Sequence, residues 1–413
     1  MANSYLNRTM STGTSRRIFT ISNWVKRSAI SSNYPRICAY DQDDNNRFEH
    51  FFNNVDQLYI EHLSGGSQNI HLVTTRKFRD TSAWYHIVVA VDTTQGTASN
   101  RVKLYINGVQ ETNFTGTVTY PSQNADLIFG TANVFYVGAS GYQGVVQHFD
   151  GYISHAAHVD GQALAPTVFG STDSTSGIWK FKSPSGVTWG TNGFHLKFEN
   201  SAALGTDSSG NSNTFTVNGN LKQALDTPSN VYATMNPLAR FYRNPTFSLG
   251  NLKLVGDNNW NGAAATLGFS TGKWYWEVKL SGTMAGHFVG VCNYDGNFTP
   301  INPQQQSGAT LFYNHDGGEM RVDGSDTTAD YGTFSSGDIA GVAIDMSAGS
   351  YGQITIYKNG VALVSNFNLS SNTSGIVVPL LVNDSATQEI NFGNGYFGTT
   401  AITSAGSNGN GSL

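Results

Sequence analysis

LYINGV at residues 104–109 and IYKNGV at residues 356–361 are nearly the same six-residue word, written twice in one chain. Asn-Gly after alternating apolar residues is a strong signal for a β-hairpin turn, because both central positions of a type I′ turn need positive φ. In each copy the aliphatic side chains before the turn lie on one face of a strand and the tyrosine on the other, since the side-chain period is two. The sequence therefore predicts a hairpin at each place.

The sequences that flank the two copies also match. Upstream lie the apolar runs WYHIVVAVD and GDIAGVAIDM, each followed by a polar stretch that contains glycine. Runs that are apolar on both faces are typical of strands buried in the middle of a sandwich. Downstream, each copy continues to an Asn-Phe pair, at Asn113 and at Asn366. We therefore predict that residues 84–114 and 337–367 occupy equivalent places in two related β-sandwiches.

The rest of the chain also has the pattern of short strands and turns. Alternating segments recur from Ile18 onward, and no long segment has the 3.6-residue period of a helix. We predict an all-β protein with two antiparallel sandwiches. The expected division is a docking arm (1–17), a first sandwich (18–165), a Gly-, Ser- and Asn-rich connector with strands (166–237), a second sandwich (238–398) and a polar tail (399–413).

Composition and charge exclude several classes of function. Only 12% of the residues are charged, and the formal net charge of −5 is spread without long runs, so nucleic acid is not an expected partner. No apolar stretch approaches the length of a membrane-spanning helix, and the N-terminus lacks the apolar region of a secretory signal. Cys38 and Cys292 lie in apolar segments of different halves, and we expect buried free thiols rather than a disulfide.

Motifs in both halves resemble known domain families. AWYHIVVAVD, VKLYINGV and the closing FDGYISHAAHVDGQAL (149–164) resemble a laminin-G or concanavalin-A-like lectin domain. GKWYWEVKL (272–280), VGVC, GDIAGVAIDM, ITIYKNG, VVPLL and INFGNGYF resemble, in this order, a SPRY domain. The resemblance implies two concanavalin-like antiparallel jelly rolls joined by a β-containing connector.

The opening YLNRTMSTGTSRRIFTISNWVKRS (5–28) and the middle stretches NGFHLKF, DSSGNSN and DTPSNVYATMNP are similar to virion proteins of marine tailed bacteriophages. Those proteins join the same two sandwich types in tail-fibre, spike or head-decoration roles. The resemblance implies a non-enzymatic virion protein, made in the host cytoplasm, for host-surface adhesion or capsid decoration. Its implied partners are other virion proteins and a glycan or protein of the host surface, without membrane insertion.

Two other classes of function stay open, namely a cellular glycan-binding adhesin and a glycan depolymerase. A retaining glycosidase needs two carboxyl groups about 5–5.5 Å apart, and residues i and i+2 of a strand lie near that spacing. A Glu-x-Asp-x-Glu strand would be the signal, and it does not occur. We also identify no Gly-x-Ser-x-Gly elbow after a strand. We therefore expect no enzymatic activity and name no catalytic residue.

Two kinds of cluster have to be weighed as metal sites. DQDDNN (41–46) and DSSGNSN (207–213) are rich in oxygen, but neither has the spacing of a complete calcium loop, and Asp and Asn also bond their own backbone in turns. His155 and His158, near His148 and Asp160, are expected on opposite faces of a strand, where one metal reaches both only across a bulge. We predict no metal and no cofactor, with calcium at a loop left as an alternative.

The candidate ligand-binding residues are aromatic side chains in loops of the second sandwich, since sugar rings stack their C–H faces on aromatic rings. The alternative for the tryptophan of this set is that it closes the end of the sandwich, whereas Trp274 and Trp276 are expected in the core. Single sites on a sandwich rim bury little area and bind weakly, so we expect a homo-oligomer or an array that gains avidity. The predicted set is Trp260, Tyr294, Phe298 and His315.

Overall fold

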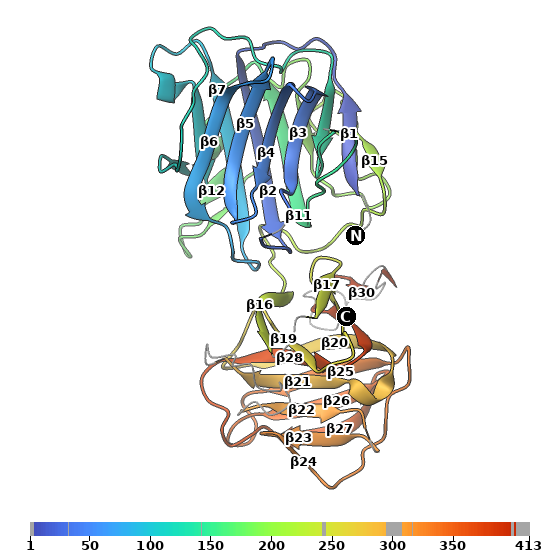
Figure 1. The fold of residues 1–413 in the computed structure, drawn as a ribbon. Helices are drawn as coiled ribbons and strands as arrows, with labels where there is room; N and C mark the ends of the chain where they lie inside the picture. The colour runs from blue at the N-terminus through green and yellow to red at the C-terminus, as the bar shows by residue number, and fades with distance from the viewer. Residues whose placement is uncertain are drawn as a thin grey trace. The chain divides into compact units, whose positions relative to one another are not determined.

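The computed structural model of the chain describes residues 4–401 apart from 32, 142, 242–244, 295–307, 316 and 398–399. The described residues form antiparallel strands and three single-turn 3₁₀ helices, η1 (Ala98–Asn100), η2 (Pro166–Val168) and η3 (Met284–Gly286). The chain divides into two compact units, Met1–Gln223 with Thr227–Ser229 and Ala224–Asp226 with Asn230–Leu413 (Figure 1). The prediction of an all-β fold is confirmed.

The first unit is a sandwich of two antiparallel sheets (Figure 1). Its first sheet has the strand order β15 (Thr216–Asn218), β1 (Tyr5–Thr9), β10 (Val134–Val137), β3 (Arg36–Asp43), β4 (Asn46–Phe52), β5 (Gln57–Ser64) and β6 (Ser67–Lys77). Its second sheet has the order β14 (Phe194–Leu196), β11 (Gly151–Asp160), β2 (Ile18–Arg27), β7 (Trp84–Asp92), β8 (Val102–Ile106) and β9 (Val109–Glu111). A separate two-stranded ribbon pairs β12 (Gly170–Thr172) with β13 (Trp179–Phe181).

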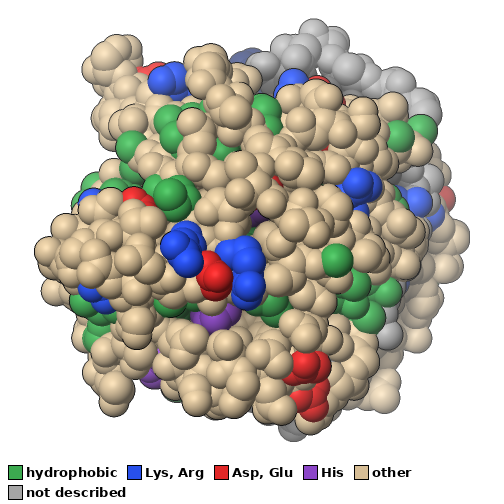
Figure 2. Space-filling view, turned by 90° about the horizontal axis from the view of Figure 1, so that it is seen from above, with side chains coloured by type: hydrophobic (Ala, Val, Ile, Leu, Met, Phe, Trp, Pro, Cys, Tyr) green, Lys and Arg blue, Asp and Glu red, His purple; other side chains and the backbone are tan. Residues whose placement is uncertain are grey.

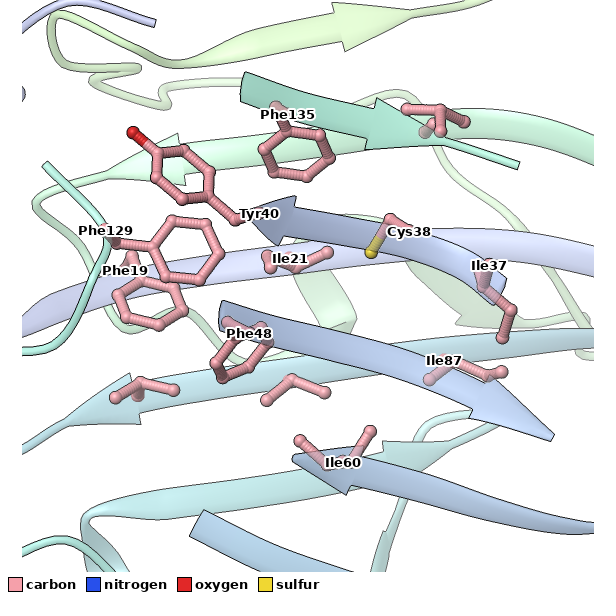
Figure 3. Packing of buried hydrophobic residues seen from close by; sticks show 14 of the residues in the cluster. Phe19, Ile21, Ile37, Cys38, Tyr40, Phe48, Ile60, Ile87, Phe129 and Phe135 are labelled. Atoms are coloured by element: carbon pink, nitrogen blue, oxygen red, sulfur yellow. The ribbon is translucent and has the colours of Figure 1, made fainter. Parts of the chain in front are cut away.

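The core of the first unit lies between its two sheets and is rich in aromatic rings. Figure 3 shows Phe19 of β2, Tyr40 of β3 and Phe48 of β4 gathered around Phe129, which comes from a loop. The ring centroid of Phe129 lies 4.1 Å from that of Phe19, 4.6 Å from that of Tyr40 and 4.9 Å from that of Phe48. The strands alternate as their sequences predict, so one face of each sheet supplies this core.

The second unit also consists of two antiparallel sheets. One has the order β16 (Met235–Phe241), β19 (Asn261–Ala265), β28 (Val377–Asn383), β21 (Phe288–Asn293), β22 (Thr310–Tyr313), β23 (Glu319–Val322) and β24 (Ser325–Asp326). The other has the order β17 (Thr246–Ser248), β18 (Lys253–Val255), β29 (Ala386–Asn391), β20 (Lys273–Gly282), β25 (Ile339–Asp345), β26 (Gln353–Lys358) and β27 (Val361–Asn368). A short pair, β30 (Tyr396–Phe397) and β31 (Thr400–Ala401), follows.

The two Asn-Gly turns have the same local geometry. Asn107 and Asn359 have φ of 49° and 50°, and the glycine after each has φ of 80° and 83°. The Asn107 side chain accepts a hydrogen bond from the backbone N–H of His86 at 2.7 Å, and Asn359 accepts one from Ile339 at 2.8 Å. Each turn thus anchors its hairpin to the first residues of the buried strand beside it, and the predicted equivalence of the two repeats is confirmed.

Other expectations from the sequence can be checked at once. Cys38 and Cys292 are buried and form no disulfide, as predicted. In the described part of the chain, no helix has the length and apolar character needed to cross a membrane.

The structure differs from the predicted division of the chain at its N-terminus. Residues 5–9, predicted as part of a docking arm, form β1, which lies between β15 and β10 in the first sheet. Leu6 and Met10 are 4% and 3% exposed and belong to the core of the first unit. The segment looks polar because only alternate residues of this short strand face the core.

The predicted connector likewise belongs largely to the first unit. Its strands β14 and β15 extend the two sheets, and the stretch before them covers the outer face of the second sheet. Phe169 is buried there against Val88 and Val159, with Trp189 packed at the margin of the same cluster. The connector has little periodicity because its strands are only three residues long and isolated aromatic side chains between and within them cover the sheet.

Asp160, at the end of β11, joins three segments of the first unit. Its carboxylate accepts hydrogen bonds from the backbone N–H groups of Thr14 at 2.7 Å, Ser15 at 3.0 Å and Asn192 at 3.0 Å. Asn192 in turn donates through its side chain to the carbonyl of Ser11 at 2.7 Å. The N-terminal segment and the former connector are therefore fixed to the second sheet through one buried carboxylate.

We predict that Asp160→Asn destabilises the first unit, because an amide places a donor against one of these backbone N–H groups. Removing a hydrogen bond to a charged group costs about 1.5–3 kcal/mol, and each kcal/mol shifts the melting temperature of a domain of this size by roughly 2–4 °C. Calorimetry of the full chain should show this shift. Asp126→Asn is the matched control, since Asp126 also holds the N-terminal segment, through Arg17 at 2.7 Å, but its side chain is 45% exposed. Equal shifts in the two variants would contradict the prediction.

A second prediction compares the two turns. Gly108→Ala and Gly360→Ala both place a Cβ at positive φ, which costs roughly 1–2 kcal/mol. A Cβ at Gly108 would also lie 2.5 Å from the Trp179 ring, whereas a Cβ at Gly360 meets no atom within 4 Å. We expect the first variant to lose roughly 1–3 kcal/mol more through overpacking. Calorimetric transitions of both variants measure the difference, and a Gly108→Ala variant no less stable than Gly360→Ala would show that the contact is unimportant.

Candidate functional site

Four aromatic side chains form a row at one end of the sheet that contains β21. The rings of Phe288 and Tyr313 are stacked at 4.0 Å, Tyr313 and His315 are stacked at 5.1 Å, and Trp260 packs edge-on against Phe288 at 5.5 Å. The strand register explains the row, because Phe288 and Tyr313 are cross-strand partners at the ends of β21 and β22. We refer to these four residues as the aromatic row.

The aromatic row lies on the outer face of its sheet. Val289 and Val291 of β21 face the core between the two sheets, whereas Phe288 and Cys292 belong to a separate apolar cluster. Phe288 is fully buried, and Trp260, Tyr313 and His315 are each partly exposed. Partly exposed rings anchored by a buried one form a rigid apolar surface of the kind that suits a ligand with C–H faces.

The structure brings together two of the four predicted ligand-binding residues. Trp260 and His315 both join the row through Tyr313. Tyr294 follows β21 at the opposite end of the strand from Phe288, with its backbone N–H donating to the carbonyl of Ile376. Phe298 lies outside the described residues. The sequence analysis did not predict Tyr313 as a site residue, because its surroundings are those of an ordinary strand. Only the strand register identifies it as the centre of the row.

The two tryptophans that were expected in the core have different environments. Trp276 is 2% exposed and lies in the core of the second unit, as expected. Trp274 is 49% exposed and stacks on Phe269 at 5.1 Å, so the core assignment is wrong for this residue. It is the second residue of β20, close to the strand end, where the opposite sheet no longer covers the position. The alternation of side chains along a strand predicts which face each residue lies on. It does not predict how far along the strand the opposite sheet covers that face.

Ser22 and His86 resemble a nucleophile and its base, but their hydrogen bonds exclude that role. Ser22 Oγ lies 2.8 Å from His86 Nε2, and the indole N–H of Trp179 donates to His86 Nδ1 at 2.9 Å. Because an indole only donates, Nδ1 must be the acceptor of the neutral ring, and the proton is on Nε2. His86 therefore donates to Ser22 and cannot remove its proton. Both side chains are also buried.

A Gly-x-Ser-x-Gly sequence does follow a strand, which corrects the expectation from the sequence. GFSTG, residues 268–272, comes shortly after β19. It leads into strand β20 instead of a helix, whereas a nucleophile elbow is a strand-to-helix turn. Ser270 is exposed in this loop, so the match does not provide the strained geometry of such an elbow.

Carboxylates do gather on the outer face of the first sheet, across strands rather than along one. Glu49 of β4 is the register partner of Glu61 of β5. Arg36 binds Glu49 through two contacts of 3.0 and 3.1 Å, and Arg47 joins Glu49 and Glu61 at 3.1 and 3.2 Å. Although burial raises the pKa of Glu49, the two guanidinium groups outweigh burial and lower it. The neighbouring Asp41 has its pKa raised to about 7 by burial and by Glu49.

The candidate metal clusters are occupied by protein contacts. The His155 ring stacks on Phe181 at 3.4 Å, at a bulge of β11, whereas His158 is buried in the core side of the same strand against Phe129. Asp207 accepts backbone hydrogen bonds from His195, Ser209 and Asn213, as expected of an Asx turn. Among the described residues, no group of three or more His, Cys, Asp or Glu side chains could hold a metal ion.

Comparisons with known proteins identify two domain types. Residues 2–168 match a laminin G model described as the concanavalin A-like lectin/glucanases superfamily, and residues 273–395 match the SPRY domain. The chain thus contains a concanavalin-like domain followed by a SPRY domain, as the motifs predicted. Domains of these two types point to binding or adhesion in general.

No curated protein matches the chain. Many solved structures are similar to it, and three of them are SPRY domains. The SPRY domain of human HERC1 is 18% identical, with 38% of this chain and 96% of that one covered and a TM-score of 0.31. The TRIM65 PSpry domain is 14% identical (39% and 92%, TM-score 0.30), and a further human SPRY domain is 17% identical (34% and 91%, TM-score 0.28).

Buried histidines give the first unit a dependence on pH. Burial lowers the pKa of His50 and His86 to about 3, and the pKa of His62, His158 and His195 to about 4. An unfolded chain takes up these protons near pH 6.5, so the unfolded state gains protons first as the pH falls. Each such histidine therefore removes up to about 1.4 kcal/mol of stability per pH unit between pH 6.5 and its folded pKa.

Buried carboxyl groups oppose this effect in part. Burial raises the pKa of Asp41 to about 7 and that of Asp150 to about 6, so these groups are protonated in the fold at a pH where the unfolded chain has already lost the protons. In the second unit, burial lowers the pKa of His287 to about 4 and raises that of Glu277, and the two contributions oppose each other. The first unit therefore has the larger excess of buried neutral histidines over buried carboxyl groups with a raised pKa.

We predict that acidification from pH 7 to pH 4.5 lowers the melting temperature of the first unit more than that of the second. The reason is the surplus of buried neutral histidines, which favour the unfolded state as they gain protons there. Calorimetry of the full chain at several pH values measures both transitions in one sample, so the second unit serves as the internal control. Parallel shifts of the two transitions would show that these histidines do not govern acid stability.

Proposed function

We propose that the chain is a non-enzymatic virion protein of a tailed bacteriophage that binds a host-surface glycan or protein, as part of a tail fibre or spike or as a capsid decoration. The observation that carries the binding role is the aromatic row of Trp260, Phe288, Tyr313 and His315, with three partly exposed rings on a buried anchor. The row belongs to the unit that contains the SPRY domain, which follows a concanavalin-like domain in the chain, and both domain types support a binding role. The virion setting rests on the resemblance of the opening and middle segments to phage proteins.

The surface chemistry supports this proposal. Only 12% of the residues are charged, and 46 are glycine. Figure 2 shows a face on which charged side chains are scattered singly or in small groups. Such a surface offers hydroxyl and amide groups to neutral ligands and has no charged area large enough to select a polyanion.

The candidate catalytic groups support binding over hydrolysis. His86 holds its proton on the nitrogen that faces Ser22, and Glu49 is engaged by two arginines. A general acid for glycoside hydrolysis needs a raised pKa and access to substrate. Glu49 has a lowered pKa and a fully buried side chain, and Asp41 is 8% exposed. The depolymerase therefore stays as the second candidate only because the fold is shared with glucanases.

The proposal predicts that peptides of this chain are found by mass spectrometry in purified particles of the phage that encodes it. The full chain should bind the surface of host cells, and His315→Ala and Trp260→Ala should weaken that binding about tenfold or more, since each removes one ring of the row. Trp274→Ala is the matched control, because it also removes a partly exposed tryptophan of the same unit. Melting temperatures establish that each variant is folded.

Three results would contradict the proposal. Absence of the peptides from the particles would exclude the virion role. Shortening of host polysaccharide by the purified chain would favour the depolymerase. Equal losses in the Trp274→Ala control would show that the aromatic row is not the binding surface.

A further inference from the structure

Two histidines from distant parts of the chain meet on the outer face of the second sheet of the first unit. His195 of β14 is the register partner of Ala157 of β11, which belongs to the apolar cluster on that face, and His155 lies two residues before Ala157. His155 Nδ1 lies 3.4 Å from His195 Nε2. The sequence analysis weighed His155 together with His158, but His158 packs against Phe129 of the core. The partner of His155 is instead 40 residues away, in the former connector.

His155 stands at a bulge of β11. The pairing of β11 with β2 changes register between Ser154 and Ala157, and His155 lies within this shift with a φ of 48°. Left-handed backbone is uncommon for a residue other than glycine, and bulges re-aim side chains beside functional sites. Such a conformation persists only where the surrounding structure holds it. The fold therefore keeps a strained histidine opposite a second histidine.

Aromatic neighbours hold both imidazole rings. His155 stacks on Phe181 of β13 at 3.4 Å, and His195 stacks with Trp189 at 5.8 Å. These contacts use the faces of the rings, whereas the ring nitrogens lie at the edges. Burial lowers the pKa of His155 to about 3 and that of His195 to about 4, so both rings are neutral at pH 7. A neutral imidazole has one nitrogen without a proton, which is the form that binds a metal ion.

The distance between the two nitrogens identifies the kind of ion that fits. It exceeds the roughly 2.7–3.2 Å that is usual for a hydrogen bond from an N–H group. Two imidazole nitrogens at roughly 2.0–2.1 Å from one tetrahedral zinc ion lie roughly 3.3–3.4 Å apart. Neighbouring nitrogens of a square-planar copper ion at the same bond length would lie roughly 2.8–2.9 Å apart. The observed 3.4 Å therefore matches tetrahedral coordination.

The pair lies at the margin of the segment that covers this sheet. His195 is 3% exposed, so a cation reaches the pair from the side of His155. Two charged groups close to His195 act in opposite directions, because Lys197 lowers its pKa and Asp207 raises it. Lys197 is also paired with Glu199 at 3.7 Å, which offsets its charge. The partly exposed side chains of the pair and its neighbours are those of His155, Phe181, Trp189 and Lys197.

We propose that His155 and His195 together bind one zinc ion in tetrahedral coordination, with water in the two remaining positions. The bound ion joins the bulge of β11 to β14, which is the end strand of the second sheet, and so holds the former connector to the sandwich. This site goes beyond the proposed binding function and is independent of the aromatic row in the second unit.

The test titrates zinc chloride into the full chain, treated beforehand with EDTA, and measures binding by isothermal titration calorimetry. We expect one zinc ion per chain. His155→Asn and His195→Ala should each weaken binding about tenfold or more, because each removes one of the two protein ligands. Asparagine is chosen at position 155 because it tolerates positive φ. His71→Ala is the matched control, since His71 is also a partly exposed histidine of the first unit, with its Nδ1 2.7 Å from the carbonyl of Thr117.

Zinc should also raise the melting temperature of the first unit and leave that of the second unchanged, because an ion that binds the folded state stabilises it. Melting temperatures without zinc show whether each variant is folded, and if His195→Ala is not, His155→Asn decides. No zinc binding up to about 1 mM, unchanged binding in His155→Asn, or an equal loss in His71→Ala overturns the proposal. Binding of copper(II) without binding of zinc also overturns it, because the pair would then not be a tetrahedral site.

Discussion

The first unit depends on one buried carboxylate that receives backbone N–H groups from distant parts of the chain. Asp160 accepts from Thr14, Ser15 and Asn192, and these contacts fix both the segment before β2 and the segment after β12 and β13 to the second sheet. The approach is so close that a Cβ at Gly190 would lie 1.9 Å from the Asp160 carbonyl oxygen. This single acceptor joins both the supposed arm and the supposed connector to the sandwich. Without either segment, the buried Asp160 carboxylate would lose hydrogen bonds that compensate for its burial.

The same arrangement decides which surfaces of the first unit can meet a ligand. The segment held by Asp160 covers the outer face of the second sheet, where the Trp179 ring sits over Gly108 of the hairpin turn and over Gly170. That ring also donates to His86 and stacks with it at 6.0 Å, so a Ser-His pair is made inert by the residue that covers it. The outer face of the first sheet carries the Arg36–Glu49–Arg47 ion pairs.

Much of this fold could be predicted from the sequence because its information is local. Asn107 and Asn359 need positive φ and are followed by glycine, so the hairpins and the equivalence of the two units follow from six letters and their flanks. The site could be predicted only in part. Trp260 and His315 meet because Tyr313 lies at a register position between them, and register depends on long-range pairing that no short motif reveals.

The ion pairs of Glu49 show how this concanavalin-like sandwich uses a buried carboxylate on the outer face of its first sheet. Glu49 spends its two oxygens on Arg36 and Arg47. Glu111 is likewise buried and paired with an arginine, since its Oε2 lies 3.4 Å from Arg76 Nε. A carboxylate with both oxygens paired stabilises the sheet and cannot deliver a proton, because its pKa is lowered. For the proposed binding function, weak single sites would gain useful strength if a particle displays many copies of the chain.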